Sequence, residues 1–158
     1  MEKIPITKAG EKDLVEKLRQ LKTKDRPDIS QAIADARAHG DLKENAEYHA
    51  AKEQQGLIES RVIAINDLIA RANVIDVTKI DNDGKVIFGS TIKVQDLESN
   101  KEISYKLVGQ DEADISKNFV YFRSPIGKSL IGKNNKDVLI VKTPSGEKNL
   151  EILKVDYI

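Results

Sequence analysis

The chain contains no cysteine and no tryptophan, and phenylalanine and tyrosine together make up only 4% of its 158 residues. Without cysteine it can form neither a disulfide bond nor a zinc site with thiolate ligands. The few aromatic side chains argue against a large aromatic core and against an extended base-stacking surface. No apolar run approaches the roughly 20 residues of a membrane span, and Met1–Pro5 lacks the start of a secretory signal. We therefore expect a soluble cytoplasmic protein that does not bind membranes.

Neither half of the chain carries an excess of one charge. Lysine plus arginine and aspartate plus glutamate each number 26. Residues 1–75 contain 13 of each sign, which leaves 13 of each for residues 76–158. Bulk electrostatic attraction to nucleic acid is therefore not expected. A nucleic-acid role would have to work through a local patch or through a protein partner.

The strongest periodic pattern lies in residues 46–75, which contain no proline and one glycine, Gly56. Apolar and small residues recur there at alternating intervals of three and four, as in a coiled-coil seam. The pattern predicts one helix of roughly 45 Å. The seam consists of Tyr48, Ala51, Gln55, Ile58, Val62, Ile65, Ile69 and Ala72.

A second, less regular helical pattern comes before it, starting near Thr7 and ending at Gly40. Its apolar seam changes phase near Pro27, which predicts a kink or short break around Lys24–Pro27 because proline disfavours helical geometry in the residue before it. The connection Gly40–Asn45 is short, so the two helices are predicted to form an antiparallel coiled-coil hairpin.

The second half changes to short segments rich in valine and isoleucine, separated by turn residues. A single short helix is predicted at Ile126–Gly132, with Pro125 in its first turn. The fold class is therefore α+β, with a long helical hairpin in residues 1–75 and a small domain of sheet plus helix in residues 76–158. The predicted strands are Val74–Ile80, Val86–Phe88, Thr91–Gln95, Ile103–Val108, Asp137–Lys142 and Glu151–Val155.

Two acidic residues, Asp41 and Glu44, fall at the predicted tip of the hairpin. Their spacing is typical of a capping box, in which Asp41 caps the second helix and Glu44 returns to the backbone amide of Asp41. Alternatively, both carboxylates point outward as hard oxygen ligands for Mg²⁺. Two carboxylates form only a half-site, which needs further ligands from elsewhere. Spacing alone favours the capping box and leaves the metal half-site as the alternative.

Two pairs of residues flank the tip. His39 and His49, together with the acids, are candidates for a transition-metal site, or they are surface histidines that balance charge. Arg37 and Lys52 are either solvated surface charges or a small patch that contacts a phosphate backbone. Residues 76–158 contain no histidine, so no Ser-His-Asp or Cys-His arrangement can form there. We therefore expect a docking module rather than an enzyme in that half.

A long and specific motif surrounds the tip. It comprises Arg26, Pro27, Ile29, Ala34, Ala36, Arg37, His39, Gly40, Asp41, Leu42, Glu44, Asn45, Glu47, Tyr48, Ala51, Lys52 and Gln55. Further motif residues follow in Phe88–Thr91, Val108–Gly109, Glu112–Asp114, Ser124–Gly127 and Leu130–Lys133. With these residues the chain resembles the bacterial Gre transcription elongation factors, and the resemblance extends over essentially the whole chain.

The resemblance implies a C-terminal domain of FKBP-like topology that docks at the rim of the secondary channel of RNA polymerase. The docking surface maps around Ser124, Pro125 and Ile126. The coiled coil would pass down that channel, where the polymerase's own active site cuts backtracked RNA. The chain would then not be an enzyme by itself, and the free protein would be a monomer without cofactor.

The resemblance also assigns roles to the tip residues. Asp41 and Glu44 align with the catalytic acids, which help to bind a second Mg²⁺ shared with the polymerase and to position the attacking water. Arg37 and Lys52 align with the basic patch that contacts the extruded RNA 3′ end.

Three other functions are compatible with such a fold. One is an inhibitory paralogue that blocks the channel, although such relatives tend to carry a more acidic tip, and here Leu42 and Lys43 separate the acids. Another is a non-catalytic polymerase-binding adaptor. The last is a peptidyl-prolyl isomerase, which needs an aromatic-lined pocket that the few aromatic residues of 76–158 hardly provide.

Overall fold

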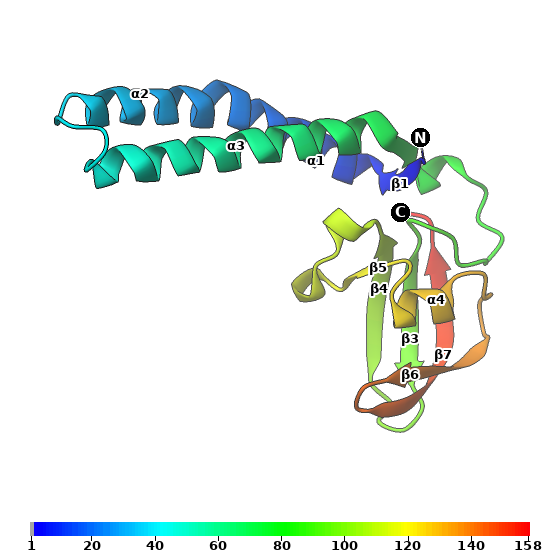
Figure 1. Cartoon of the computed structure of the whole chain (residues 1–158). Coiled ribbons are helices and arrows are strands. Elements are labelled where there is room, and N and C mark those ends of the chain that lie inside the picture. Colours follow the sequence, from blue (N-terminus) through cyan, green and yellow to red (C-terminus); the bar gives the residue numbers. More distant parts are fainter. Residues whose placement is uncertain (1) are drawn as a thin grey trace. The chain divides into compact units, whose positions relative to one another are not determined.

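Two structural units make up residues 2–158, the part of the chain that this computed structural model describes (Figure 1). One unit spans Glu11–Ala72, and the other joins Lys3–Gly10 to Asn73–Ile158. The N-terminal strand thus belongs with the C-terminal half of the chain. No helix within residues 2–158 combines the length and the apolar character that crossing a membrane needs.

The first unit is an antiparallel helical hairpin, as predicted from the two apolar seams (Figure 1). Its first arm consists of α1 (Lys8–Gln20), a π-helical turn (Leu21–Asp25) and α2 (Arg26–Arg37), and its second arm is α3 (Ala46–Arg71). At 1.5 Å per residue, the 26 residues of α3 span about 39 Å. The helix ends four residues before the predicted end because strand β2 begins at Ala72.

The predicted irregularity in the first arm takes the form of the π-helical turn just before Pro27. The Arg26 N–H donates to the Leu21 carbonyl, one residue beyond the α-helical partner. Pro27 then falls in the first turn of α2, where its missing N–H costs least. The extra residue in the turn accounts for the change in phase of the apolar seam.

The centre of the hairpin contains a small apolar cluster. Leu21, Ile58 and Val62 are buried there, flanked by half-buried side chains from both arms. A bidentate ion pair braces the arms beside the cluster, with Arg26 Nε and Nη2 lying 2.7 and 2.8 Å from the two oxygens of Glu59. The hydrogen bonds from Arg26 hold the pKa of the Glu59 carboxyl below its ordinary value. Towards the tip, only a narrow seam of Ile33, Ala36 and Ala51 is buried.

The second unit is built on a five-stranded sheet with strand order β5-β4-β3-β7-β6. Strands β4 and β5 pair in parallel, and the other neighbours are antiparallel. Helix α4 packs against β5 and β6, over a core that includes the fully buried Ile92, Leu107, Leu130 and Ile152. The bounds are β3 Thr91–Asp96, β4 Glu102–Val108, β5 Phe119–Tyr121, α4 Pro125–Leu130, β6 Val138–Thr143 and β7 Gly146–Asp156.

A two-stranded sheet forms separately from β1 (Ile4–Thr7) and β2 (Ala72–Ile75). Single turns of 3-10 helix lie at Val77–Lys79, Gln110–Glu112 and Ile115–Lys117. The predicted strands that correspond to β3, β4, β6 and β7 are confirmed, as is the short helix α4.

Two of the predicted strands are wrong. Of Val74–Ile80, only the first two residues belong to β2, because the Asp76 carboxylate accepts from the Thr78 N–H and starts a 3-10 turn. Val86–Phe88 leads into a turn in which the Ser90 N–H donates to the Ile87 carbonyl at 3.1 Å. Of the apolar residues on which these two predictions rested, Val77, Val86 and Phe88 are buried outside the named strands, whereas Val74 and Ile80 are exposed.

One carboxylate, that of Glu112, ties the start of the chain to the segment after β4. Its Oε2 accepts the N–H groups of Thr7 and Gly109, each at 3.1 Å, and its Oε1 accepts the Thr7 hydroxyl proton. The Thr7 Oγ1 in turn accepts the Gly10 N–H at 3.0 Å. All of these residues belong to the second unit. A Cβ added at Gly10 would overlap Glu112 Oε1 and Cδ.

Gly10→Ala is therefore expected to lower the free energy of unfolding by about 1–3 kcal/mol, since the methyl group must displace a carboxylate with several hydrogen bonds. The control is Gly56→Ala in the middle of α3, where a Cβ would meet no atom within 4 Å. That substitution should instead stabilise the protein by about 0.5–1 kcal/mol through helix propensity. Urea unfolding followed by circular dichroism measures both changes, and equal stability of the two variants would contradict the packing at Gly10.

Candidate functional site

The site is the connection between α2 and α3, at the free end of the hairpin. The last turn of α2 is closed by N–H groups of Ala38 and His39, which donate to the carbonyls of Asp35 and Ala36 at 3.2 and 3.1 Å. The chain then reverses at Gly40, whose φ of 125° is open to glycine but strained for other residues. Gly40 therefore ends the first arm, as predicted.

Asn45 caps α3 and also joins the two arms. Its Oδ1 accepts the Tyr48 N–H at 3.0 Å, and its Nδ2 donates to the carbonyl of Ala36 in α2 at 2.6 Å. The interpretation of Asp41 and Glu44 as a capping box is therefore wrong. Asparagine caps helices as well as aspartate does, and the seam of α3 starts at Tyr48, so the sequence did contain a signal for a cap at Asn45.

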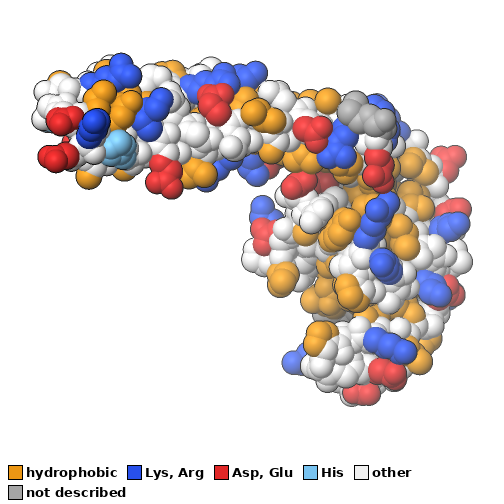
Figure 2. Space-filling model, viewed as in Figure 1, with side chains coloured by type: hydrophobic (Ala, Val, Ile, Leu, Met, Phe, Trp, Pro, Cys, Tyr) orange, Lys and Arg blue, Asp and Glu red, His pale blue; other side chains and the backbone are white. Residues whose placement is uncertain are grey.

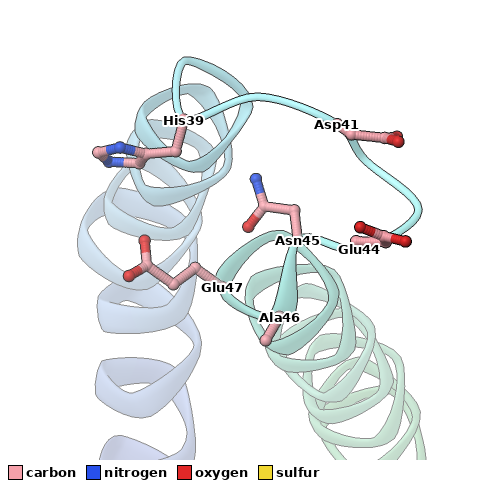
Figure 3. A pocket seen from close by; sticks show the side chains of 6 residues that line it. All are labelled: His39, Asp41, Glu44, Asn45, Ala46 and Glu47. Atoms are coloured by element: carbon pink, nitrogen blue, oxygen red, sulfur yellow. The ribbon is translucent and has the colours of Figure 1, made fainter.

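With Asn45 as the cap, both carboxylates are released from that role and both are exposed. Asp41 Oδ1 accepts the Lys43 N–H at 3.0 Å. The Glu44 carboxylate forms no hydrogen bond with any residue in the part of the chain that the structure describes. Figure 3 shows both side chains pointing away from the helices on the same side of the connection. Two solvated, unpaired carboxylates on one side form an open half-site for a hard cation such as Mg²⁺.

The two histidines do not join the acids. His39 lies on the opposite side of the tip, near Glu47 (Figure 3). His49 is engaged with the backbone, with its Nε2 3.2 Å from the Lys43 carbonyl oxygen. No group of three or more His, Cys, Asp or Glu side chains within residues 2–158 is placed to bind a metal ion. The alternative of a transition-metal site built by this chain alone is therefore wrong.

Arg37 and Lys52 lie on the two arms behind the tip, and both are exposed. The Arg37 guanidinium lies over the Tyr48 ring, with Cζ 5.7 Å from the ring centroid. Lys52 Nζ donates to Gln55 Oε1 at 3.2 Å. Figure 2 shows acidic side chains at the free end of the hairpin and Lys and Arg side chains behind them. In this view, anions lie in front of cations at the free end only, and farther along the hairpin acidic and basic side chains are interspersed.

Two family models match the chain. One, described as transcription elongation factor, N-terminal, matches residues 4–74, and the other, described as transcription elongation factor, GreA/GreB, C-term, matches residues 81–157. The chain belongs to the GreA/GreB family of transcription elongation factors. The resemblance predicted from the tip motif is therefore confirmed.

Curated relatives of this GreA/GreB family member match over the full length. Transcription elongation factor GreA of Pelagibacter ubique is 59% identical, and that of Thioalkalivibrio sulfidiphilus is 51% identical, in each case over 100% of both chains. Among solved structures, the GreA factor homolog 1 (Gfh1) of Thermus thermophilus is 25% identical and aligns over 98% of this chain and 99% of its own, with a TM-score of 0.44. The family assignment depends on the family models and the sequence identities.

The residues predicted to dock on a polymerase lie at the start of α4. The Ser124 hydroxyl accepts the Gly127 N–H at 3.1 Å and so caps the helix. Pro125 follows as the first helical residue and is exposed, whereas Ile126 is half-buried against the core of the sheet. Ser124 and Ile126 thus also shape and anchor α4, and Pro125 is the residue of the three that solvent reaches most.

Proposed function

We propose that this GreA/GreB family member stimulates the RNA polymerase's own cleavage of backtracked RNA and so rescues stalled elongation complexes. In this proposal the hairpin enters the secondary channel and brings its tip to the polymerase active site. The observation that carries the proposal is the exposed pair Asp41 and Glu44, which point to one side of the tip and are not used as helix caps.

The tip supplies part of a metal site rather than a complete one. Glu44 offers two carboxylate oxygens and Asp41 one that does not accept the Lys43 N–H, which suits a hard cation whose remaining ligands come from a partner. A second Mg²⁺ held between the tip and the polymerase would complete a pair of metal ions, of which one would activate the attacking water and the other would stabilise the leaving oxygen. Asp41 and Glu44 would bind and orient that shared ion, and they would position the water.

Neutral net charge fits this proposal, because affinity would come from protein docking rather than from attraction to nucleic acid. The docking surface proposed for the second unit is the start of α4, around Ser124, Pro125 and Ile126. The FKBP-like topology of that unit stays a prediction. A hairpin arm of about 39 Å has the length to reach into a deep channel.

The test is an assay on elongation complexes halted in a backtracked position. The chain should raise the rate of RNA cleavage by the polymerase, and the purified chain alone should not cut free RNA, since its half-site lacks the other metal ligands. The proposal fails if the halted complexes are cleaved at the same rate with and without the chain, or if the chain alone degrades free RNA.

A second prediction concerns Arg37 and Lys52, which we propose contact the extruded RNA. Replacing both by glutamine should reduce stimulation by roughly threefold to tenfold when the extruded RNA is long, since exposed charge contacts are individually weak. Complexes backtracked by two nucleotides should respond less, because less RNA reaches the patch. Cleavage rates on both kinds of complex measure this difference.

The matched control is the double substitution of Lys22 and Lys24 by glutamine. It removes the same charge from exposed positions at the π-helical turn, far along the hairpin from the tip. This control should leave both rates unchanged. Equal losses on long and short extruded RNA in the Arg37 and Lys52 variant would rule out the RNA patch.

A further inference from the structure

Between the two tip acids lies Lys43, whose backbone is hydrogen-bonded on both sides. Its N–H donates to Asp41 Oδ1 at 3.0 Å, and its carbonyl oxygen lies 3.2 Å from His49 Nε2. A carbonyl oxygen can only accept, so Nε2 of His49 carries the proton in this contact. The backbone that separates the acids is thus tied at one end to Asp41 and at the other to α3.

These two contacts restrain two of the three peptide planes between Asp41 and Glu44, the planes on either side of Lys43. The Lys43 carbonyl and the Glu44 nitrogen belong to one planar peptide unit, so an anchor on that carbonyl also sets the direction in which the Glu44 Cα leaves the plane. Glu44 itself lacks a hydrogen bond to any of the residues described. The contact from His49 therefore restrains Glu44 from the side of the connection, while the capping residue Asn45 restrains it from the side of α3.

His49 is suited to this task because it stands on regular helix. Its own N–H donates to the Asn45 carbonyl at 3.1 Å, and it is the fourth residue of α3. Its ring meets the Tyr48 ring edge to face, with centroids 5.5 Å apart, and Tyr48 is in turn covered by the Arg37 guanidinium. The imidazole thus extends from the first turn of α3 to the backbone between the two acids.

We propose that His49 is a positioning residue for the metal half-site, which sets the separation and direction of the Asp41 and Glu44 carboxylates through the Lys43 backbone. This inference rests on the proposed function, since it assigns His49 a role in the same site. Positioning acts on affinity for the shared ion rather than on the affinity of the chain for the polymerase. Loss of the contact should therefore change the Mg²⁺ dependence of stimulated cleavage.

The test compares two variants of similar length in the full chain, His49→Gln and His49→Met. Gln retains an N–H donor that can reach the Lys43 carbonyl, whereas Met fills similar space without a donor. With halted polymerase complexes and saturating factor, His49→Met should raise the Mg²⁺ concentration for half-maximal stimulation by about threefold to tenfold, the cost expected of one lost hydrogen bond. His49→Gln should restore a value near that of the unsubstituted chain.

Thermal unfolding and competition for polymerase binding should be unchanged in both variants, because His49 is exposed and lies outside the buried seam. The inference is overturned if His49→Met shows the Mg²⁺ dependence of the unsubstituted chain, or if His49→Gln is impaired as strongly as His49→Met. Glu44→Gln, measured in the same assay, distinguishes failure of the proposed function from failure of the role proposed for His49. Full stimulation by Glu44→Gln would reject the proposed function, whereas its loss together with a normal His49→Met would reject only the role of His49.

Discussion

Replacing Asp41 by asparagine or Glu44 by glutamine is expected to reduce stimulated RNA cleavage by about 10²–10³-fold, in the range seen when one preorganised charge-stabilising group is removed from an active site. Each substitution preserves size and removes the negative charge that would attract a divalent cation. Both residues are exposed, and the hydrogen bond from the Lys43 N–H to Asp41 Oδ1 is the one contact that a substitution could weaken. Folding should therefore be unaffected. Affinity for polymerase, measured by competition, should also stay the same.

Glu47→Gln is the control for these two variants. Glu47 belongs to the first turn of α3 and borders the same hollow at the tip, but its side chain lies on the side opposite to Asp41 and Glu44 (Figure 3). Neutralising it changes the net charge of the tip by the same amount without touching the proposed half-site. Stimulation should persist in Glu47→Gln, and an equal loss in all three variants would indicate that general tip charge matters rather than metal binding.

Ile58→Ala is expected to destabilise the hairpin by about 3 kcal/mol, as a large-to-small change in a tightly packed core does. Ile58 is 4% exposed and forms the centre of the apolar cluster with Leu21 and Val62. Because the hairpin has only this small cluster and a narrow seam, it has little other apolar packing to compensate for the cavity. The loss of helical circular dichroism on heating should shift to lower temperature.

The neighbouring substitution Leu57→Ala gives the matched control, since Leu57 lies in the same helix but is 49% exposed. It should cost less than about 1 kcal/mol. Because the tip is carried by the hairpin, stimulation by Ile58→Ala should also fall as the temperature rises, earlier than it does for Leu57→Ala. Similar melting of the two variants would contradict the assignment of Ile58 to the core.

The sequence predicted helices and strands best where the residues of one element show a clear hydrophobic pattern by themselves. The helix α3 follows from an uninterrupted seam from Tyr48 to Ile69, and β3, β4, β6 and β7 follow from runs of valine and isoleucine between turn residues. Strands β1 and β5 have four and three residues and exist because partners distant in sequence pair with them. No local sequence pattern predicts such short strands.

At the tip, spacing alone did not decide which task Asp41 and Glu44 have. Asp41 and Glu44 fit a capping box as well as a metal half-site, and the choice depends on Asn45, whose amide reaches Ala36 on the opposite arm. That contact exists only once the arms are antiparallel. The contact of His49 with the Lys43 carbonyl likewise depends on the path of the connection, which residue spacing does not specify.

The central claim is that the tip carboxylates complete a magnesium site that the polymerase leaves open. It is tested most directly by titrating Mg²⁺ into halted, backtracked complexes, with and without the chain, and measuring the rate of RNA cleavage. The account predicts that the chain lowers the Mg²⁺ concentration for half-maximal cleavage severalfold, and that Glu44→Gln abolishes this shift. An unchanged half-maximal concentration, with cleavage accelerated equally at every Mg²⁺ level, would contradict it.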